Sequence, residues 1–259
     1  MEVVNLSIEL LLLLFLIAVI AGLLDTLAGG GGLISLPALI LSCIPPLAAL
    51  GTNKLQGSMG TATATFLMLK NKRITWPEIK PLMLSAFIGS ALGTLVLQFI
   101  DTEILSLVIP IVLLFIAIYF LVSPMPKEHQ GAAVLSNKQY RSTAVPAIGF
   151  YDGMFGPGTG SFFALAGVAC RGYGLVYSIA MAKPLNFATN IASLLVFIAA
   201  GHVVWVVGLL MMLGQMIGAW MGSHFLFKIN PSYLRYVIVI MCTGMLIKYS
   251  HSMAWITCA

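Results

Sequence analysis

The sequence predicts an all-α membrane protein with about 8 to 10 transmembrane helices, built from two inverted repeats of about five apolar segments each. The first observation behind this prediction is composition: only 8% of the 259 residues are charged, 60% are hydrophobic, and the mean hydropathy is +1.03. A soluble domain carries a charge on about a quarter of its residues. Because so few charges cannot cover a surface that faces water, the composition excludes a soluble enzyme, a disordered chain and a nucleic-acid-binding protein.

The second observation is the length of the uncharged stretches, which are 26–53, 81–100, 104–126 and 184–227. The last of them is long enough for two helical spans of about 20 residues each. These stretches do not alternate apolar and polar residues, as the strands of a membrane barrel would. Since backbone polar groups must be satisfied inside lipid, we expect helices. The first 53 residues contain no Lys or Arg, so the first apolar segment is interpreted as a retained span and not as a secretion signal.

The apolar segments, in order, are 8–28, 33–44, 55–69, 81–100, 104–122, 144–156, 160–170, 185–200, 204–226 and 233–250. Segments 33–44 and 160–170 are too short to cross a hydrocarbon core of about 30 Å. Each follows a glycine-rich stretch, so we expect short broken helices after glycine-rich turns. The polar stretch 123–143 is interpreted as a linker between a first membrane repeat, 1–122, and a second, 144–259.

The third observation is that the two halves resemble each other. Aligning Lys54 with Lys183 also aligns three further pairs, Trp76 with Trp205, Gly89 with Gly218, and Gly93 with Gly222. Upstream, a gap of one or two residues aligns Asp25 with Asp152, and the GGGG of 29–32 with the GPGTG of 156–160. Chance does not readily match Trp, Lys and intramembrane Asp together, so this indicates an internal repeat. The paired Gly-x-x-x-Gly spacings predict close helix packing.

The loop charges indicate that the repeats are inverted. Loop 70–80 carries four basic residues, whereas its counterpart around 201–205 carries none. Loop 101–103 is acidic, whereas its counterpart around 228–235 carries Lys228 and Arg235. Because basic loops stay in the cytoplasm, loop 70–80 and the linker are predicted to be cytoplasmic and both termini periplasmic. Inverted repeats with broken helices are typical of secondary transporters, whose binding sites lie near the bilayer midplane.

Two carboxylates, Asp25 and Asp152, lie well inside apolar segments, and the repeat pairs them. A charge at membrane depth costs several kcal/mol by insertion scales, so such residues mark a pathway or a proton relay. The alternative is that each carboxylate caps the glycine-rich break that follows it. We expect Asp25 and Asp152 to couple transport to an ion, with the proton as the leading candidate.

Two lysines, Lys54 and Lys183, lie between apolar segments without other charges nearby, and the repeat pairs them as well. We expect them to converge on one anion site, completed by the helix N-termini that follow the glycine-rich breaks. The alternative is a pair of lysines that snorkel to an interface, with neighbouring amides that only join helices. The predicted substrate-binding residues are Lys54, Lys183, Asn53, Gln56, Gly31, Gly32, Gly158, Gly160, Asn186 and Asn190.

Two rival classes of protein stay open at this point. An intramembrane aspartyl protease would use Asp25 and Asp152, but the first half reads GLLD where that class needs GxGD, and the order of the two motifs is reversed. A serine protease would use Ser161 with His202 or His224, but nothing orients the base. The other class is a non-transporting membrane scaffold.

The expected partners are a small anion and the lipid bilayer, and a homo-oligomer is left open. We expect no nucleic-acid partner, no enzyme activity and no cofactor. The four cysteines form no CxxC pair, and the histidines lack the spacing of metal ligands, so no metal site is predicted.

Four motifs then point to a known family. GLLDTLAGGGGLISLPALI and ALGTNKLQ in the first half, with FYDGMFGPGTGSF and AKPLN in the second, resemble the sulfite exporter TauE/SafE family. The resemblance extends over residues 15–250, and it is greatest to a branch without a firmly assigned substrate. It implies a multi-pass protein of the bacterial inner membrane that exports sulfite, a sulfonate or a related small organic acid. At Asp25, Lys54, Asp152 and Lys183 the chain shows no departure from the pattern of the family.

Overall fold

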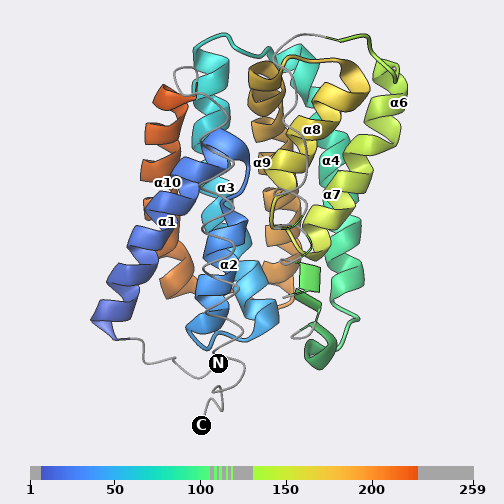
Figure 1. The fold of residues 1–259 in the computed structure, drawn as a ribbon. Coiled ribbons are helices and arrows are strands. Elements are labelled where there is room, and N and C mark those ends of the chain that lie inside the picture. The colour runs from blue at the N-terminus through green and yellow to red at the C-terminus, as the bar shows by residue number, and fades with distance from the viewer. Residues whose placement is uncertain are drawn as a thin grey trace.

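The structure, a computed structural model, describes residues 7–105 and 131–226, together with Val108, Ile109, Ile111, Val112, Phe115 and Ile118. All regular elements within these residues are helices, which confirms the predicted all-α class (Figure 1). They are α1 (Ile8–Ala28), α2 (Gly32–Leu41), α3 (Pro46–Lys70), α4 (Trp76–Leu97), α6 (Asn137–Ser142), α7 (Ala144–Met154), α8 (Thr159–Arg171), α9 (Leu175–Ala199) and α10 (Trp205–Phe225).

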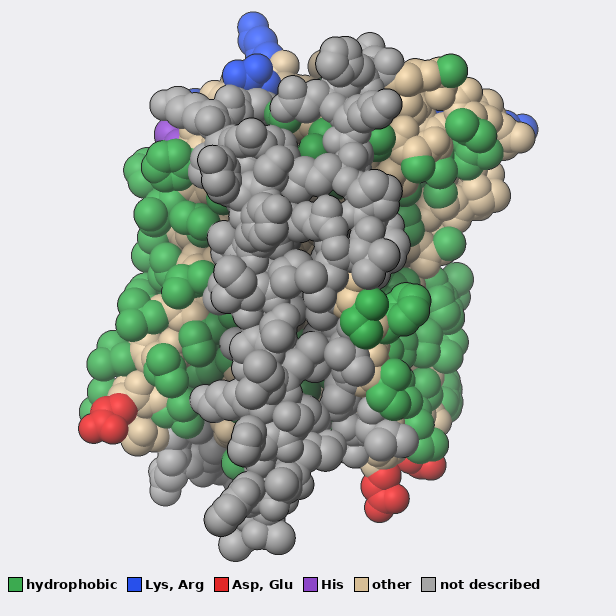
Figure 2. Space-filling view, viewed as in Figure 1, with side chains coloured by type: hydrophobic (Ala, Val, Ile, Leu, Met, Phe, Trp, Pro, Cys, Tyr) green, Lys and Arg blue, Asp and Glu red, His purple; other side chains and the backbone are tan. Residues whose placement is uncertain are grey.

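Four of the described helices, α1, α4, α9 and α10, are long and apolar enough to cross a membrane. Large apolar side chains point outward along them, as Leu84, Ile88 and Leu92 do on α4, and Figure 2 shows such side chains covering the flanks. An outer surface of this kind suits contact with hydrocarbon. The protein is therefore a multi-pass membrane protein. The predicted segment 233–250, most of 104–122, and Lys228 and Arg235 lie outside the described residues.

The predicted starts of two helices are wrong. Helix α3 begins at Pro46 and α9 at Leu175, well before the predicted segments 55–69 and 185–200. The prediction placed breaks at the polar sequences GTNKLQ and MAKPLN because it assumed that a membrane helix is apolar on every side. Their polar side chains instead point into the protein, where other segments provide partners for Asn53 Oδ1, Lys54 Nζ and Lys183 Nζ, so the helix continues through them. Lys54 and Lys183 consequently lie within helices and not at their ends.

Both predicted glycine-rich breaks are present, and a short helix follows each. Helix α1 ends at Gly29, which adopts φ 81° and donates its N–H to the Asp25 carbonyl. The second break contains Gly156 at φ 91° and Gly158 at φ 78°. Such backbone angles favour glycine because a Cβ would clash. The following helices, α2 with 10 residues and α8 with 13, reach only about 15 and 20 Å.

Glycines bring helices of the two halves into backbone contact. A Cβ at Gly218 of α10 would collide with the Val19 carbonyl oxygen of α1, and a Cβ at Gly89 of α4 would collide with the Pro146 carbonyl oxygen of α7. The predicted close packing is confirmed. Helices α3 and α9 also match in length, because their first residues lie 129 positions apart and so do their last.

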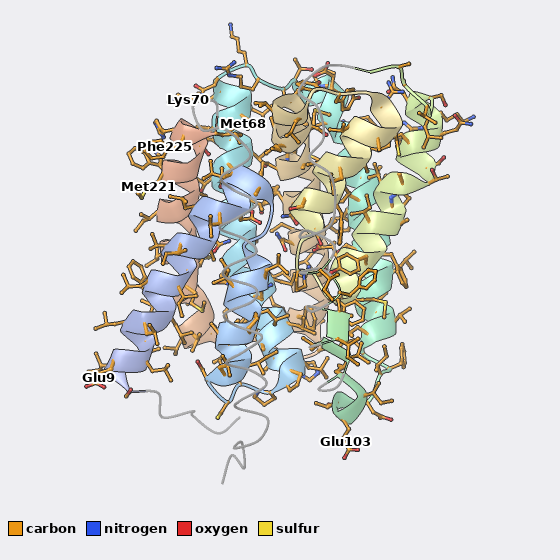
Figure 3. All side chains as sticks on the ribbon, in the orientation of Figure 1. Glu9, Met68, Lys70, Glu103, Met221 and Phe225 are labelled. Atoms are coloured by element: carbon orange, nitrogen blue, oxygen red, sulfur yellow. The ribbon has the colours of Figure 1, made fainter. Side chains whose placement is uncertain are left out.

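The two ends of the molecule differ in charge. Lys70 lies at one end, and Glu9 and Glu103 lie at the other (Figure 3); Figure 2 shows the same separation on the visible face. We call these the basic end and the acidic end. Figure 1 shows that α1 and α3 run toward the basic end, whereas α7 and α9 run away from it. Helix α6 lies at the basic end, within the stretch predicted as the linker 123–143.

Candidate functional site

A small polar cavity lies in the protein interior where both glycine-rich breaks meet α3, α9 and α10. About 20 Å³ is open to the centre of a water-sized sphere, which is room for a water molecule. Its lining includes eight of the twelve predicted site residues, Asp25, Gly32, Asn53, Lys54, Asp152, Gly158, Asn186 and Asn190. The others in the lining are Gly29, Gly57, Thr61, Gly156 and Gln215. Lys183, Gln56, Gly31 and Gly160 are not among the lining residues.

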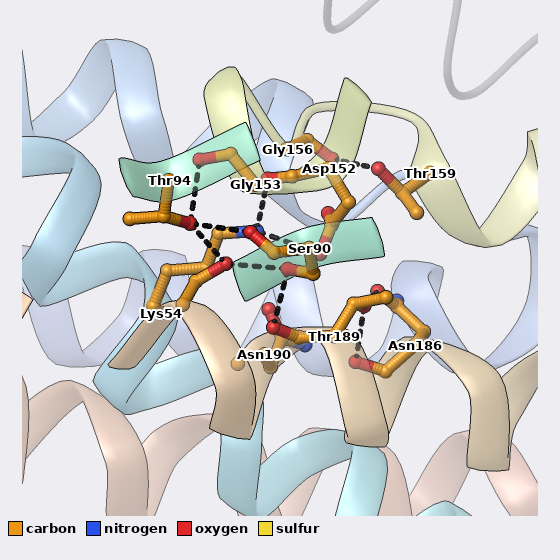
Figure 4. A network of polar contacts seen from close by, with 12 residues as sticks. Lys54, Ser90, Thr94, Asp152, Gly153, Gly156, Thr159, Asn186, Thr189 and Asn190 are labelled. Atoms are coloured by element: carbon orange, nitrogen blue, oxygen red, sulfur yellow. Dashed lines mark hydrogen bonds and ion pairs between the residues drawn. The ribbon is translucent and has the colours of Figure 1, made fainter. Parts of the chain in front are cut away.

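Lys54 forms an ion pair across the two halves of the chain. Its Nζ lies 2.8 Å from Asp152 Oδ2 and donates a hydrogen bond of 2.6 Å to the Asp152 carbonyl (Figure 4). Both residues are 1% exposed. Among the described residues, Lys54 is the only partner of Asp152 Oδ2. Removing one partner of a buried ion pair leaves an uncompensated charge, so each group depends on the other.

The equivalent lysine of the second half has a different partner. Lys183 is 0% exposed, and its Nζ donates to the backbone carbonyl of Asp25. The Asp25 carboxylate instead accepts the Gly31 N–H at 3.3 Å, which is the capping role considered as an alternative. Each lysine thus contacts the aspartate of the other half, but the ion pair described is the one between Lys54 and Asp152. Because both lysines are buried inside protein, neither snorkels to an interface.

The two glycine-rich breaks contact each other directly. A Cβ at Gly160 would lie 2.6 Å from the Gly29 Cα, and Ser161 Oγ donates to the Ala28 carbonyl. Side chains at these glycines would push the breaks apart. The breaks therefore bring the end of α1 and the beginning of α8 together at the cavity.

Two asparagines that line the cavity with Lys54 have amide donors without an acceptor among the described residues. Asn53 Oδ1 accepts from Ser35 Oγ at 2.6 Å and from Gln56 Nε2 at 2.7 Å, which orients the amide and places Gln56 behind it. The Asn186 Oδ1 faces Thr189 Oγ1 at 3.5 Å. No described acceptor meets Nδ2 of Asn53 or of Asn186, and both residues line the cavity. An anion bound there would find one cation and two N–H donors.

Sequence reasoning missed Gln215 of α10, which lines the cavity and is buried. Its Oε1 has no hydrogen-bond partner among the described residues. The signal was available, because Gln215 is the only polar amide or charged residue in 205–222. It has no polar counterpart in the predicted repeat, since Ala86 aligns with it.

A hydroxyl cluster on α4, also missed, supports the Asp152 segment (Figure 4). Thr94 Oγ1 lies 2.9 Å from the Gly153 carbonyl and 2.8 Å from Ser193 Oγ. Ser90 Oγ donates to the Thr189 carbonyl at 2.8 Å. The cluster therefore joins α4 to the residue after Asp152 and to α9. One helical turn separates Ser90 from Thr94, which is the signal that could have found them.

The contacts described give no support to a protease. Asp152 is occupied by Lys54, and Asp25 by the Gly31 amide. Ser161, the alternative nucleophile, donates to a backbone carbonyl.

Comparison with known proteins identifies a family and several relatives. The family model described as "Sulfite exporter TauE/SafE" matches residues 14–249. A "Probable membrane transporter protein" of Haemophilus influenzae is 38% identical over 251 residues, covering 97% of this chain and 98% of the relative. "Probable membrane transporter protein ORF9" of Sinorhizobium sp is 39% identical and covers 94% of each chain. "Probable membrane transporter protein YfcA" of Escherichia coli K12 is 38% identical, covering 91% of this chain and 87% of the relative. No solved structure matches the chain.

Proposed function

Because the chain belongs to the sulfite exporter TauE/SafE family, we propose that it is a secondary transporter that exports a small anion across a bacterial inner membrane. Sulfite, a sulfonate or a related organic acid is the substrate class. The observation that carries the proposal is the buried ammonium of Lys54, which faces a polar cavity between two broken helices. An anion that loses its hydration needs fixed positive charge and hydrogen-bond donors in return.

The proposed architecture is a pair of inverted repeats around this cavity, which move so that the cavity opens to one side of the membrane and then to the other. The repeat is supported by α3 and α9, which have the same length and whose first and last residues are separated by the same number of positions. Matched glycine contacts support it as well: Gly22 meets the Gln215 carbonyl, and Gly149 meets the carbonyl of Ala86, the residue aligned with Gln215. The opposite directions of α1 and α7, and of α3 and α9, support the inversion (Figure 1). We infer eight to ten crossings in all, with the remainder in residues outside those described.

In the proposed mechanism the anion takes the place of Asp152 beside Lys54. The cavity as it stands holds about 20 Å³, enough for water but not for an oxyanion. Space must therefore come from a movement of the Asp152 carboxylate. Asn53 and Asn186 then donate their free amide N–H groups, and the N-terminal amides of α2 and α8 complete the site.

Displacing Asp152 would leave a buried carboxylate without a partner, which is costly unless it takes up a proton. Anion and proton therefore bind together, and low pH favours the anion-bound state. Asp152 is the coupling acid of the arrangement described. Asp25, whose carboxylate accepts the Gly31 N–H, would be the corresponding acid when the cavity opens to the other side of the membrane.

Transport by the purified protein in liposomes tests this function. We expect uptake of radiolabelled sulfite that rises as pH falls. Asp152→Asn imitates the protonated acid, so transport should lose its pH dependence or cease. Asp25→Asn is the matched variant. Its asparagine oxygen can still accept the Gly31 N–H, so the fold should be kept, but the proposed counterpart acid is removed and transport should likewise lose its pH dependence or cease.

Full pH-dependent transport by Asp152→Asn would show that neither this carboxylate nor its proton takes part. Liposomes that move none of sulfite, sulfonates or carboxylates at any pH would favour the scaffold alternative.

We also propose that the basic end is cytoplasmic and that both termini are periplasmic, since basic loops remain inside. Cys43 is exposed in the turn between α2 and α3, at the acidic end. With Cys170, Cys242 and Cys258 replaced by serine, it should react with an impermeant maleimide added to intact spheroplasts. Lys138→Cys in a cysteine-free chain should react only after lysis. The reverse pattern would overturn the topology.

A further inference from the structure

A second cavity, much larger than the first, lies at the basic end. It has a volume of about 480 Å³ and lies between the beginning of α4, helix α6, the end of α8 and the beginning of α9. The residues that line it are Pro77, Glu78, Pro81, Leu82, Asn137, Lys138, Arg141, Arg171, Tyr173, Tyr177 and Met181. None of them lines the inner cavity. We call it the basic-end pocket.

The pocket carries an excess of positive charge. Lys138, Arg141 and Arg171 line it, against one carboxylate, Glu78. Glu78 Oε2 already accepts the Thr75 N–H at 3.1 Å and the Thr75 hydroxyl at 2.7 Å, in the capping box of α4. Neither Lys138 nor Arg141 forms an ion pair with a described carboxylate. Among the described residues, therefore, no carboxylate neutralises these two charges.

Neighbouring residues fix the guanidinium of Arg171 but leave one of its N–H donors without a described partner. Its Nη1 donates to the Leu135 carbonyl, and its Cζ lies 5.7 Å from the centre of the Tyr173 ring. Its Nε is buried and has no partner among the described residues. Tyr173 in turn packs edge-on against Tyr177, with ring centres 5.1 Å apart. A fixed guanidinium on an aromatic wall matches the geometry of a phosphate group.

We propose that the basic-end pocket binds a phosphate ester, supplied either by the head group of an anionic phospholipid or by a soluble organic phosphate. Its volume suits a ligand of head-group size and far exceeds what a small transported anion needs. The two tyrosines and Met181 offer an apolar wall to the organic part of the ligand. Because α4 and α9 are membrane spans that begin at this pocket, it opens at the level where lipid head groups lie.

The site is separate from the transport cavity, so binding can be measured without transport. The full-length protein in detergent would be titrated with short-chain phosphatidylglycerol, short-chain phosphatidylcholine or glycerol phosphate, and its thermal unfolding followed. We expect phosphatidylglycerol to raise the unfolding temperature and phosphatidylcholine to have little effect. The double variant Lys138→Gln/Arg141→Gln should weaken the apparent affinity about tenfold or more, and its exposed positions should leave folding intact.

The control removes the same charge from the same end of the molecule. Lys70→Gln/Lys80→Gln changes two exposed lysines that do not line the pocket, and it should shift the affinity less than about twofold. Arg171→Lys keeps the charge but loses the fork of donors, so it should also weaken binding. If glycerol phosphate competes with phosphatidylglycerol, a soluble phosphate ester is sufficient as the ligand. If only the phospholipid binds, the ligand is the lipid head group at the membrane surface. Equal affinity in both double variants, or no binding of any phosphate, would overturn the proposal.

Discussion

Replacing Lys54 with glutamine is expected to reduce anion transport at least 100-fold, as measured by radiolabelled sulfite uptake into liposomes. Among the described residues, Lys54 supplies the only ammonium in the lining of the inner cavity. Its loss also leaves Asp152 buried without its ion-pair partner, which costs about 3–5 kcal/mol of unfolding free energy. Lys54→Arg should rescue transport poorly, because the planar guanidinium differs in shape and reach.

Two control variants separate the binding role of Lys54 from its structural role. Lys54→Gln/Asp152→Asn removes both charges, so it should regain most of the stability but none of the transport. Lys183→Gln removes a lysine that contacts only the Asp25 carbonyl in the described residues, so its stability cost should be smaller than that of Lys54→Gln. Transport by the double variant at the wild-type rate would contradict the anion-binding role of Lys54.

Replacing Gly218 with alanine is expected to destabilise the protein by about 3 kcal/mol or more, the upper range for an overpacked interior. The new Cβ would collide with the Val19 carbonyl oxygen and lie 2.7 Å from the Leu23 nitrogen. Both are backbone atoms of α1, so relief requires α1 and α10 to separate. Reversible unfolding in mixed detergent micelles would measure the loss.

Gly208→Ala, on the same helix, is the matched control. Its Cβ would approach the Leu55 Cδ2 methyl, which can rotate away, so the cost should be much smaller. Gly89→Ala should cost about as much as Gly218→Ala, because its Cβ would meet the Pro146 carbonyl in the equivalent way. A well-tolerated Gly218→Ala would contradict the tight packing of α1 on α10.

The membrane location and the helical class could be predicted from the sequence, because they depend on the solvent around the chain. With 8% charged residues the chain cannot face water, and in lipid its backbone must form helices. The glycine-rich breaks were predictable because GGGG and GPGTG allow positive φ angles that other residues avoid. The predicted repeat singled out Lys54 and Asp152 together with Lys183 and Asp25, and the motifs that resemble the family contain the same four residues.

Only the tertiary structure decided how these groups are partnered. Helices α3 and α9 continue through polar sequences because distant segments provide partners for their lysines. A hydropathy profile, which follows the chain alone, contains no information about such partners. For the same reason the sequence could not distinguish Lys54, which pairs with a carboxylate, from Lys183, which contacts a carbonyl. Gln215 reaches the cavity, and Arg171 the basic-end pocket, only because packing brings α10 and the end of α8 there. Burial and pairing are properties of the assembled helices, since they depend on which residues meet across the two halves.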